Sequence, residues 1–213
     1  LFVDHLPAVS SPVAELIKRY PIKSENVIAH IRKATQGEVN LENCHPFVRE
    51  CWGQYWVFAH NGDLKEFNPV LNGQFLPVGS TDSERAFCYL LQSMRAEFGD
   101  QPPTTGQVAR FLQEKCRDIA AHGTFNMMLS NGEALFTHCS TKLHYVVRQH
   151  PFPVANLSDQ ELRVDFSEVT TPSDKVAVIV TEPLTTNECW TQFGSGEFKV
   201  FVKGDVLMPE QWQ

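Results

Sequence analysis

Apolar residues recur at helical spacing in the middle of the chain, which indicates a long amphipathic helix. Between Asp82 and about Phe98 they are three to four residues apart, so they fall on one helical face. These residues are Ala86, Phe87, Leu90, Leu91 and Met94. The segment Thr81-Asp82-Ser83-Glu84 has the pattern of a capping box, in which a threonine hydroxyl closes the first helical turn. We therefore predict a helix that begins at Asp82.

Two further helices follow from the same kind of pattern. Thr104-Thr105-Gly106-Gln107 is a second capping box, and the apolar stripe after it predicts a helix through Ala121 that Gly123 ends. Near the start of the chain, the segment from Pro12 to Tyr20 has proline in its first turn and apolar residues on one side. It predicts a short helix.

Runs of β-branched and aromatic residues predict strands on both sides of the two long helices. The predicted strands cover residues 27–32, 55–60, 124–129, 134–138, 143–147, 175–181 and 197–203. Asn131-Gly132 lies between two of these runs and is a strong hairpin signal. Because strands, two helices and strands follow one another in blocks, we expect antiparallel sheets covered by helices, not a parallel βαβ sheet. The Pro-, Ser- and Asp-rich stretch 151–174 is the predicted long loop.

Composition narrows the class of protein. The chain has 213 residues, of which 42% are hydrophobic and 20% charged, so we expect one globular domain over residues 1–213. A formal net charge of -7 without a basic run argues against nucleic acid as a partner, and no apolar stretch approaches the roughly 20 residues that span a bilayer. Six scattered cysteines without a C-x-x-C pair favour reduced thiols and a cytoplasmic location.

Four short segments carry the candidate chemistry: Ala29–Thr35, Asn43–Phe47, Ala59–Gly62 and Gly79–Glu84. Together they supply a cation in Arg32, a side-chain amide beside a glycine in Asn61-Gly62, and a carboxylate in Asp82. Such groups can hold an amino acid at both charged ends and stabilise an oxyanion on its side chain.

Each of these residues also has a purely structural explanation. Asn-Gly is the commonest hairpin-turn dipeptide, an arginine after a strand is usually a solvated charge, and an aspartate in a first helical turn suits the helix dipole. The histidines 30, 45 and 60 have no metal-ligand spacing, so we expect no metal and no cofactor. Cys44 and His45 are adjacent on an extended segment and should point to opposite faces, which argues against a catalytic dyad.

Taken in order, the four segments resemble the class II glutamine amidotransferase domain, an N-terminal nucleophile hydrolase. The likeness is closest to the stand-alone bacterial amidotransferases of this class, and it continues through 123–127, 140–144 and 181–184. It implies a four-layer αββα fold, with two mainly antiparallel sheets packed face to face between helical layers.

The resemblance also implies a role for each candidate residue. Arg32, assisted by Thr35, would bind the α-carboxylate of glutamine, and Asp82 would bind the α-ammonium. The Asn61 side chain and the Gly62 backbone N–H would form the oxyanion hole. A tight Asn-Gly turn would present both groups at once.

In this family the nucleophile is a cysteine at the mature N-terminus, whose own α-amino group acts as the base. The chain begins with Leu1, which cannot do this work. We therefore expect a preceding segment, with the nucleophile, that is not part of these 213 residues.

The resemblance implies hydrolysis of the glutamine side-chain amide to glutamate and ammonia through a cysteinyl thioester. Because the sequence shows no acceptor-binding domain, ammonia would leave free or pass to a separate acceptor subunit. Two alternatives stay open. One is hydrolysis of a γ-glutamyl amide or peptide on the same fold. The other is a non-catalytic sensor that binds glutamine through Arg32 and Asp82.

Overall fold

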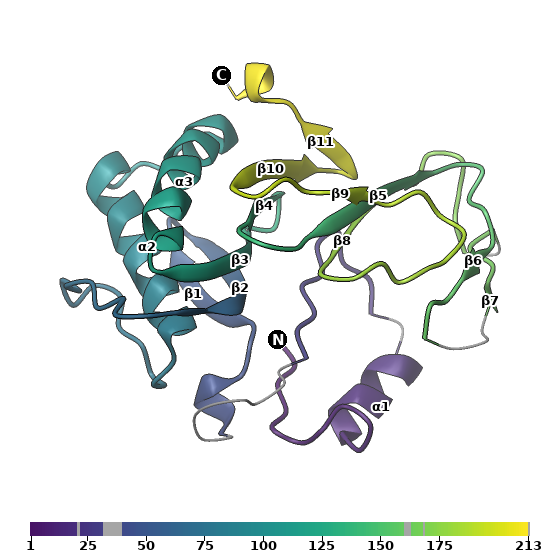
Figure 1. The fold of residues 1–213 in the computed structure, drawn as a ribbon, viewed down its shortest axis with the longest axis horizontal. Coiled ribbons are helices and arrows are strands. Elements are labelled where there is room, and N and C mark those ends of the chain that lie inside the picture. The colour runs from purple at the N-terminus through teal and green to yellow at the C-terminus, as the bar shows by residue number, and fades with distance from the viewer. Residues whose placement is uncertain (21, 32–39, 160–162, 168, 213) are drawn as a thin grey trace.

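The computed structural model describes residues 1–20, 22–31, 40–159, 163–167 and 169–212 (Figure 1). It shows an α+β protein with antiparallel sheets, as the order of elements predicted. The helices in these ranges are α1 (Pro12–Arg19), α2 (Asp82–Phe98) and α3 (Thr105–Ala120), with short 3₁₀ helices at Leu41–Asn43 and Pro209–Gln211. Every helix in the described ranges is too short or too polar to span a membrane.

The largest sheet has six strands in the order β1-β2-β3-β4-β10-β11, and every neighbouring pair is antiparallel. A second sheet has the order β8-β5-β9, and β6 pairs with β7. The strands are β1 (Phe47–Cys51), β2 (Gln54–Leu64), β3 (Gly123–Ser130), β4 (Ala134–Cys139), β5 (His144–Gln149), β6 (Ala155–Asn156), β7 (Arg163–Val164), β8 (Lys175–Val180), β9 (Thr191–Gln192), β10 (Glu197–Val202) and β11 (Asp205–Leu207).

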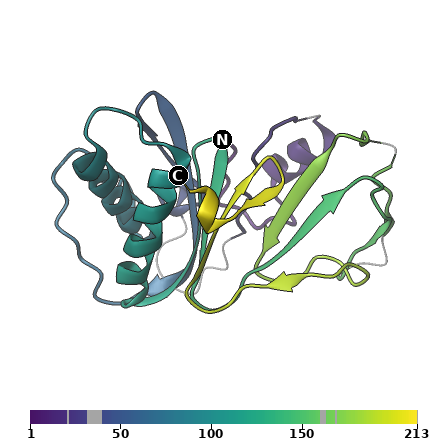
Figure 2. The same cartoon turned by 90° about the horizontal axis from the view of Figure 1, so that it is seen from above.

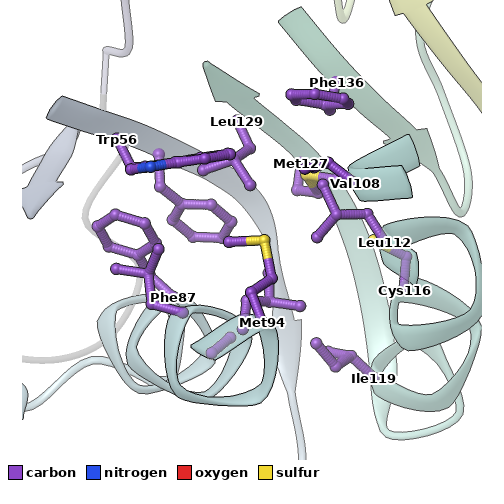
Figure 3. Close-up of a cluster of buried hydrophobic side chains, with 14 of the residues drawn as sticks. Trp56, Phe87, Met94, Val108, Leu112, Cys116, Ile119, Met127, Leu129 and Phe136 are labelled. Carbon is purple, nitrogen blue, oxygen red and sulfur yellow. The ribbon is translucent and has the colours of Figure 1, made fainter. Parts of the chain in front are cut away.

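The main hydrophobic core lies between the six-stranded sheet and the helix pair α2 and α3. Figure 3 shows Trp56, Phe87 and Met94 packed between sheet and helix, with Leu112 and Ile119 on α3 beside them. All five side chains are buried. Burying an aromatic or aliphatic side chain of this size contributes about 1.5–3 kcal/mol, so this layer is a major source of stability.

The opposite face of the six-stranded sheet packs against the three-stranded sheet. Cys139, Leu143, Phe193 and Phe201 form the buried centre of this second contact. The views of Figures 1 and 2 agree that α2 and α3 lie on one side of the large sheet, and the small sheets and α1 on the other. Since α1 buries none of its residues, a second helical layer, and with it the four-layer sandwich, stays a prediction.

The helix starts agree with the capping patterns in the sequence. The Thr81 side chain accepts a hydrogen bond from the Glu84 N–H, so α2 begins at Asp82. The Thr104 and Gln107 side chains form the reciprocal bonds of a full capping box at the start of α3. Each cap satisfies backbone N–H groups that have no partner inside the helix, which is why a local sequence pattern can predict it.

The predicted turn at Asn61-Gly62 is wrong, because both residues lie inside β2. Asn61 is opposite Asn126 and Gly62 is opposite Phe125, and the pairing with β3 continues as far as Leu64 and Gly123. Pairing with a strand more than sixty positions away outweighs the local turn preference of the dipeptide. The Asn131-Gly132 turn is confirmed, since it joins the antiparallel strands β3 and β4.

Two other predictions need correction. Residues 27–31 are not a strand: Asn26 instead donates a hydrogen bond to the Gly132 carbonyl at 2.5 Å, which holds this segment beside the β3–β4 turn. Arg32, the end of that predicted strand, lies outside the described residues. The predicted loop 151–174 contains the short strands β6 and β7, which pair with each other.

Candidate functional site

The segment His60-Asn61-Gly62 presents different groups to the two faces of β2. Neighbouring residues of a strand point to opposite faces. His60 is buried and faces the helix layer, where its ring meets Ser83 of α2. Asn61 therefore points to the other face, is exposed, and has no hydrogen bond to its side-chain amide from any part of the chain that the structure describes. This leaves the amide available to a bound molecule.

His60 joins β2, β3 and the first turn of α2. Its Nε2 lies 2.9 Å from the Thr124 carbonyl oxygen, which can only accept, so Nε2 carries the hydrogen. Its Nδ1 lies 2.8 Å from Ser83 Oγ and accepts from that hydroxyl when the ring is neutral. Burial lowers the pKa of His60, against the opposing effects of the Thr124 hydrogen bond and of the Asp82 and Asp63 carboxylates. The neutral ring is thus the favoured state.

Gly62 occupies a position that has no room for a side chain. A Cβ atom there would lie 1.9 Å from the Thr124 carbonyl oxygen and 2.6 Å from Nε2 of His60. The first of these atoms belongs to the backbone of the paired strand and cannot move aside without breaking the pairing. Glycine is therefore required here by close approach of a neighbouring strand, and not by a turn conformation.

The carboxylate of Asp82 is held at the first residue of α2. Its Oδ2 accepts a hydrogen bond from the Leu64 N–H at 2.8 Å, and its Oδ1 accepts from the Ser83 N–H at 2.8 Å. The helix N-terminus also favours a negative charge at this position. Asp82 is thereby placed against the end of β2, at Leu64, which follows Gly62 by two residues in the sequence.

A buried ion pair supports the approach to α2. Glu84 is 1% exposed; its carboxylate pairs with the Arg49 guanidinium and accepts from the N–H groups of Val78 at 3.1 Å and Gly79 at 2.7 Å. These contacts fix the chain just before α2, which begins at Asp82. The pair therefore supports the position of α2 relative to β1.

The segments Asn43–Phe47 and Gly79–Glu84 lie side by side, although more than thirty residues separate them in the sequence. Asn43 Oδ1 accepts from the Ser80 N–H at 2.9 Å, and a Cβ on Gly79 would lie 2.3 Å from that same oxygen. Next to them, the rings of His30 and His45 are stacked with centroids 4.2 Å apart. All four candidate segments are thus linked through described residues, since Ser83 of the last segment also contacts His60 of the third.

Sequence reasoning missed Asn126. It lies opposite Asn61 on β3, is 5% exposed, and its amide hydrogen-bonds the Asn61 carbonyl as well as the turn after β4. Its one signal in the sequence was its place in the Gly123–Met127 segment that resembles the family.

Burial raises the pKa of four of the six cysteines, all of which lie within the described ranges. Burial raises the pKa of Cys51 and of Cys88 to about 11, and it also raises the pKa of Cys116 and Cys139. The Sγ atom of Cys44 lies 3.3 Å from the Asn40 backbone carbonyl oxygen. Cys189, the sixth, is exposed.

The structure brings three of the five predicted site residues to one region. Asn61 and Gly62 are adjacent on β2, and Asp82 is bonded to the backbone of the same strand. Arg32 and Thr35 lie outside the described residues. Within the described ranges, no group of three or more His, Cys, Asp or Glu side chains could hold a metal ion.

The chain is similar to known proteins. The family model "Glutamine amidotransferases class-II" matches residues 1–212. A Haemophilus influenzae protein named "Putative glutamine amidotransferase" is 52% identical over 208 residues, covering 97% of this chain and 70% of the relative. The Escherichia coli protein named "Putative glutamine amidotransferase YafJ" is 46% identical over 207 residues, covering 97% of this chain and 81% of the relative.

A solved structure is similar in both sequence and fold. It is the crystal structure of a "predicted glutamine amidotransferase" from Pseudomonas aeruginosa, with 48% sequence identity and a TM-score of 0.75. The match covers 84% of this chain and 70% of that chain.

Proposed function

Because the chain belongs to the class II glutamine amidotransferase family, we propose that it hydrolyses the side-chain amide of glutamine to glutamate and ammonia. One observation carries the proposal: the exposed Asn61 amide lies beside Gly62 on the strand whose end also holds the Asp82 carboxylate. The Asn61 amide and the Gly62 N–H can donate to a reacting carbonyl oxygen, and the Asp82 carboxylate can pair with the ammonium group of an amino acid.

In this proposal each group has one task. The Asn61 side-chain N–H and the Gly62 backbone N–H donate to the oxygen of the tetrahedral intermediate, where negative charge develops. Asp82 pairs with the α-ammonium, and its bonds to Leu64 and Ser83 hold it in place before the substrate arrives. Arg32, with Thr35, binds the α-carboxylate, a task that a planar guanidinium performs with two parallel hydrogen bonds.

The chemistry is acyl transfer to a thiolate. The thiolate attacks the amide carbon, the C–N bond breaks, and the nitrogen takes up a proton and leaves as ammonia. Water then hydrolyses the thioester and releases glutamate and the thiol. Because burial raises the pKa of Cys51, Cys88, Cys116 and Cys139, the proposal does not assign the nucleophile to any of these four thiols.

The test compares two substitutions in the full-length protein by glutamate release. Asn61→Ala removes a donor that acts only in the transition state, so kcat should fall by about 10²–10³ with little change in KM. Arg32→Ala removes an interaction that ground state and transition state share, so KM for glutamine should rise. Asn68→Ala, a change at an exposed asparagine on a loop, is the matched control.

Three outcomes separate the alternatives. No turnover of glutamine, together with measurable glutamine binding, would support a sensor and refute the proposal. Faster turnover of γ-glutamyl amides than of glutamine, with the same response to Asn61→Ala, would keep the mechanism and change the substrate. Unchanged kinetics in both variants would reduce Asn61 to an ordinary strand residue.

A further inference from the structure

Asn126 is a buried polar side chain that the proposed reaction does not use. It lies on β3 directly opposite Asn61, and side chains of directly opposed residues in an antiparallel pair project from the same face. It therefore points, like Asn61, away from the helix layer. At 5% exposure its amide is removed from water, so its hydrogen bonds to the protein decide how it is oriented.

Every part of the Asn126 amide has a partner. Its Nδ2 donates to the Asn61 carbonyl oxygen at 3.1 Å and to Thr141 Oγ1 at 2.9 Å. Its Oδ1 accepts from the N–H groups of Ser140 at 2.9 Å and Thr141 at 3.1 Å. Because backbone carbonyls only accept and backbone N–H groups only donate, this network admits one orientation of the amide.

The contact with Asn61 reaches the oxyanion hole through a single peptide unit. The Asn61 carbonyl and the Gly62 N–H belong to the same planar peptide, so they point in opposite directions across it. A donor that fixes the direction of the carbonyl also fixes the direction of the N–H. The Asn126 amide thus contacts the peptide unit whose N–H group, that of Gly62, the proposed mechanism directs at the reacting oxygen.

We propose that Asn126 is a positioning residue that aims the Gly62 N–H at the reacting oxygen and ties it to the Ser140–Lys142 turn. This inference rests on the proposed function. Oxyanion stabilisation depends on donors that are oriented before the reaction, so a small rotation of this peptide costs rate and not substrate binding. Asparagine alone among the residues of its length supplies two donors and an acceptor together.

The test uses Asn126→Asp in the full-length protein. The carboxylate keeps an acceptor for the turn but has no hydrogen to donate to the Asn61 carbonyl. We expect kcat for glutamine hydrolysis to fall by about 10- to 100-fold while KM stays within about twofold. If this variant does not fold, Asn126→Ser carries the same expectation, because a hydroxyl on Cβ is too short to hold both sides of the network.

Thr141→Val is the matched control. It removes a hydrogen bond that Asn126 makes to the turn, without touching the bond to the Asn61 carbonyl. If Asn126 acts through the Asn61-Gly62 peptide, Thr141→Val should leave kcat within about twofold of wild type even where both variants lower the melting temperature. An equal loss of kcat in the two variants would mean that Asn126 merely stabilises the turn, and would overturn the inference.

The same experiment separates this inference from the proposed function. Normal kcat in Asn126→Asp, with a large loss in Asn61→Ala, would overturn the role of Asn126 alone. No turnover by the wild-type protein, or an active wild type with an unaffected Asn61→Ala variant, would overturn the proposed function and this inference with it.

Discussion

The Asp82 carboxylate accepts a hydrogen bond from the Leu64 backbone N–H at 2.8 Å, and this bond ties the first residue of α2 to the last residue of β2. The strand that carries Asn61 and Gly62 therefore also sets the position of the carboxylate. A second connection runs from His60 through Ser83, the next residue of α2. The relative placement of these groups depends on the contact between one strand and one helix start.

Replacing Asp82 by asparagine should remove its negative charge while keeping a side chain of nearly the same shape. The amide oxygen of Asp82→Asn can still accept from the Leu64 N–H, but the amide NH2 cannot accept from the Ser83 N–H, and the charge that would pair with an ammonium group is gone. We expect KM for glutamine to rise by about tenfold or more in steady-state assays, in line with the value of a charge-assisted hydrogen bond. Asp159→Asn, a change at an exposed aspartate, is the control. An unchanged KM would remove Asp82 from the binding site.

Adding a methyl group at Gly62 should destabilise the protein. In Gly62→Ala the new Cβ would lie 1.9 Å from the Thr124 carbonyl oxygen, so β2 and β3 would have to separate. We expect the free energy of unfolding in urea to fall by about 3 kcal/mol, the upper part of the range for overpacking. At Gly194 the nearest atom to an added Cβ is 3.8 Å away, so Gly194→Ala should be tolerated. Equal stability of the two variants would contradict the close approach.

Removing the Arg49 guanidinium should leave a buried charge without its counterion. Glu84 would keep its two backbone N–H donors in Arg49→Met but lose the cation that pairs with it. We expect a loss of roughly 3–5 kcal/mol in the free energy of unfolding, measured by chemical denaturation.

The matched control is Arg19→Met, which breaks an exposed pair with Glu15 on α1. Exposed pairs of this kind contribute about 0.3–0.5 kcal/mol, so this variant should stay close to wild type. A similarly small effect of Arg49→Met would show that the two backbone donors suffice for Glu84.

Two buried histidines should make the protein less stable in mild acid. Burial lowers the pKa of His60 and of His138 in the folded state. As the pH falls below about 6.5, the ordinary histidine pKa, the unfolded chain binds protons that the folded chain does not. Above that pH the two histidines therefore do not affect the free energy of unfolding. Below it, this free energy falls progressively until the pH reaches the folded-state pKa.

Urea denaturation between pH 8 and pH 5 measures this slope. His60→Gln keeps a donor for the Thr124 carbonyl and an acceptor for the Ser83 hydroxyl but cannot be protonated. The slope of unfolding free energy against pH should be smaller in this variant than in wild type. An unchanged slope would show that His60 binds its proton equally well in the folded and unfolded states.

The amino-acid sequence by itself determined the three α-helices of the described residues and the hairpin turn at Asn131-Gly132. The caps at Thr81 and Thr104 and the Asn131-Gly132 turn use hydrogen bonds between residues at most three positions apart. Such patterns are visible in a single stretch of chain. The resemblance also selected Asn61, Gly62 and Asp82 before their positions in space were known.

Only the tertiary structure decided how those residues are held. Asn61-Gly62 has the local preference of a turn, yet it continues a strand because β3, more than sixty residues later, pairs with it throughout. The partner of Asp82 is a backbone N–H eighteen positions earlier, and the Asn126 amide reaches a carbonyl sixty-five positions earlier. Backbone groups are the same in every residue, so no side-chain pattern in the sequence shows which of them will be brought together by the pairing of distant strands.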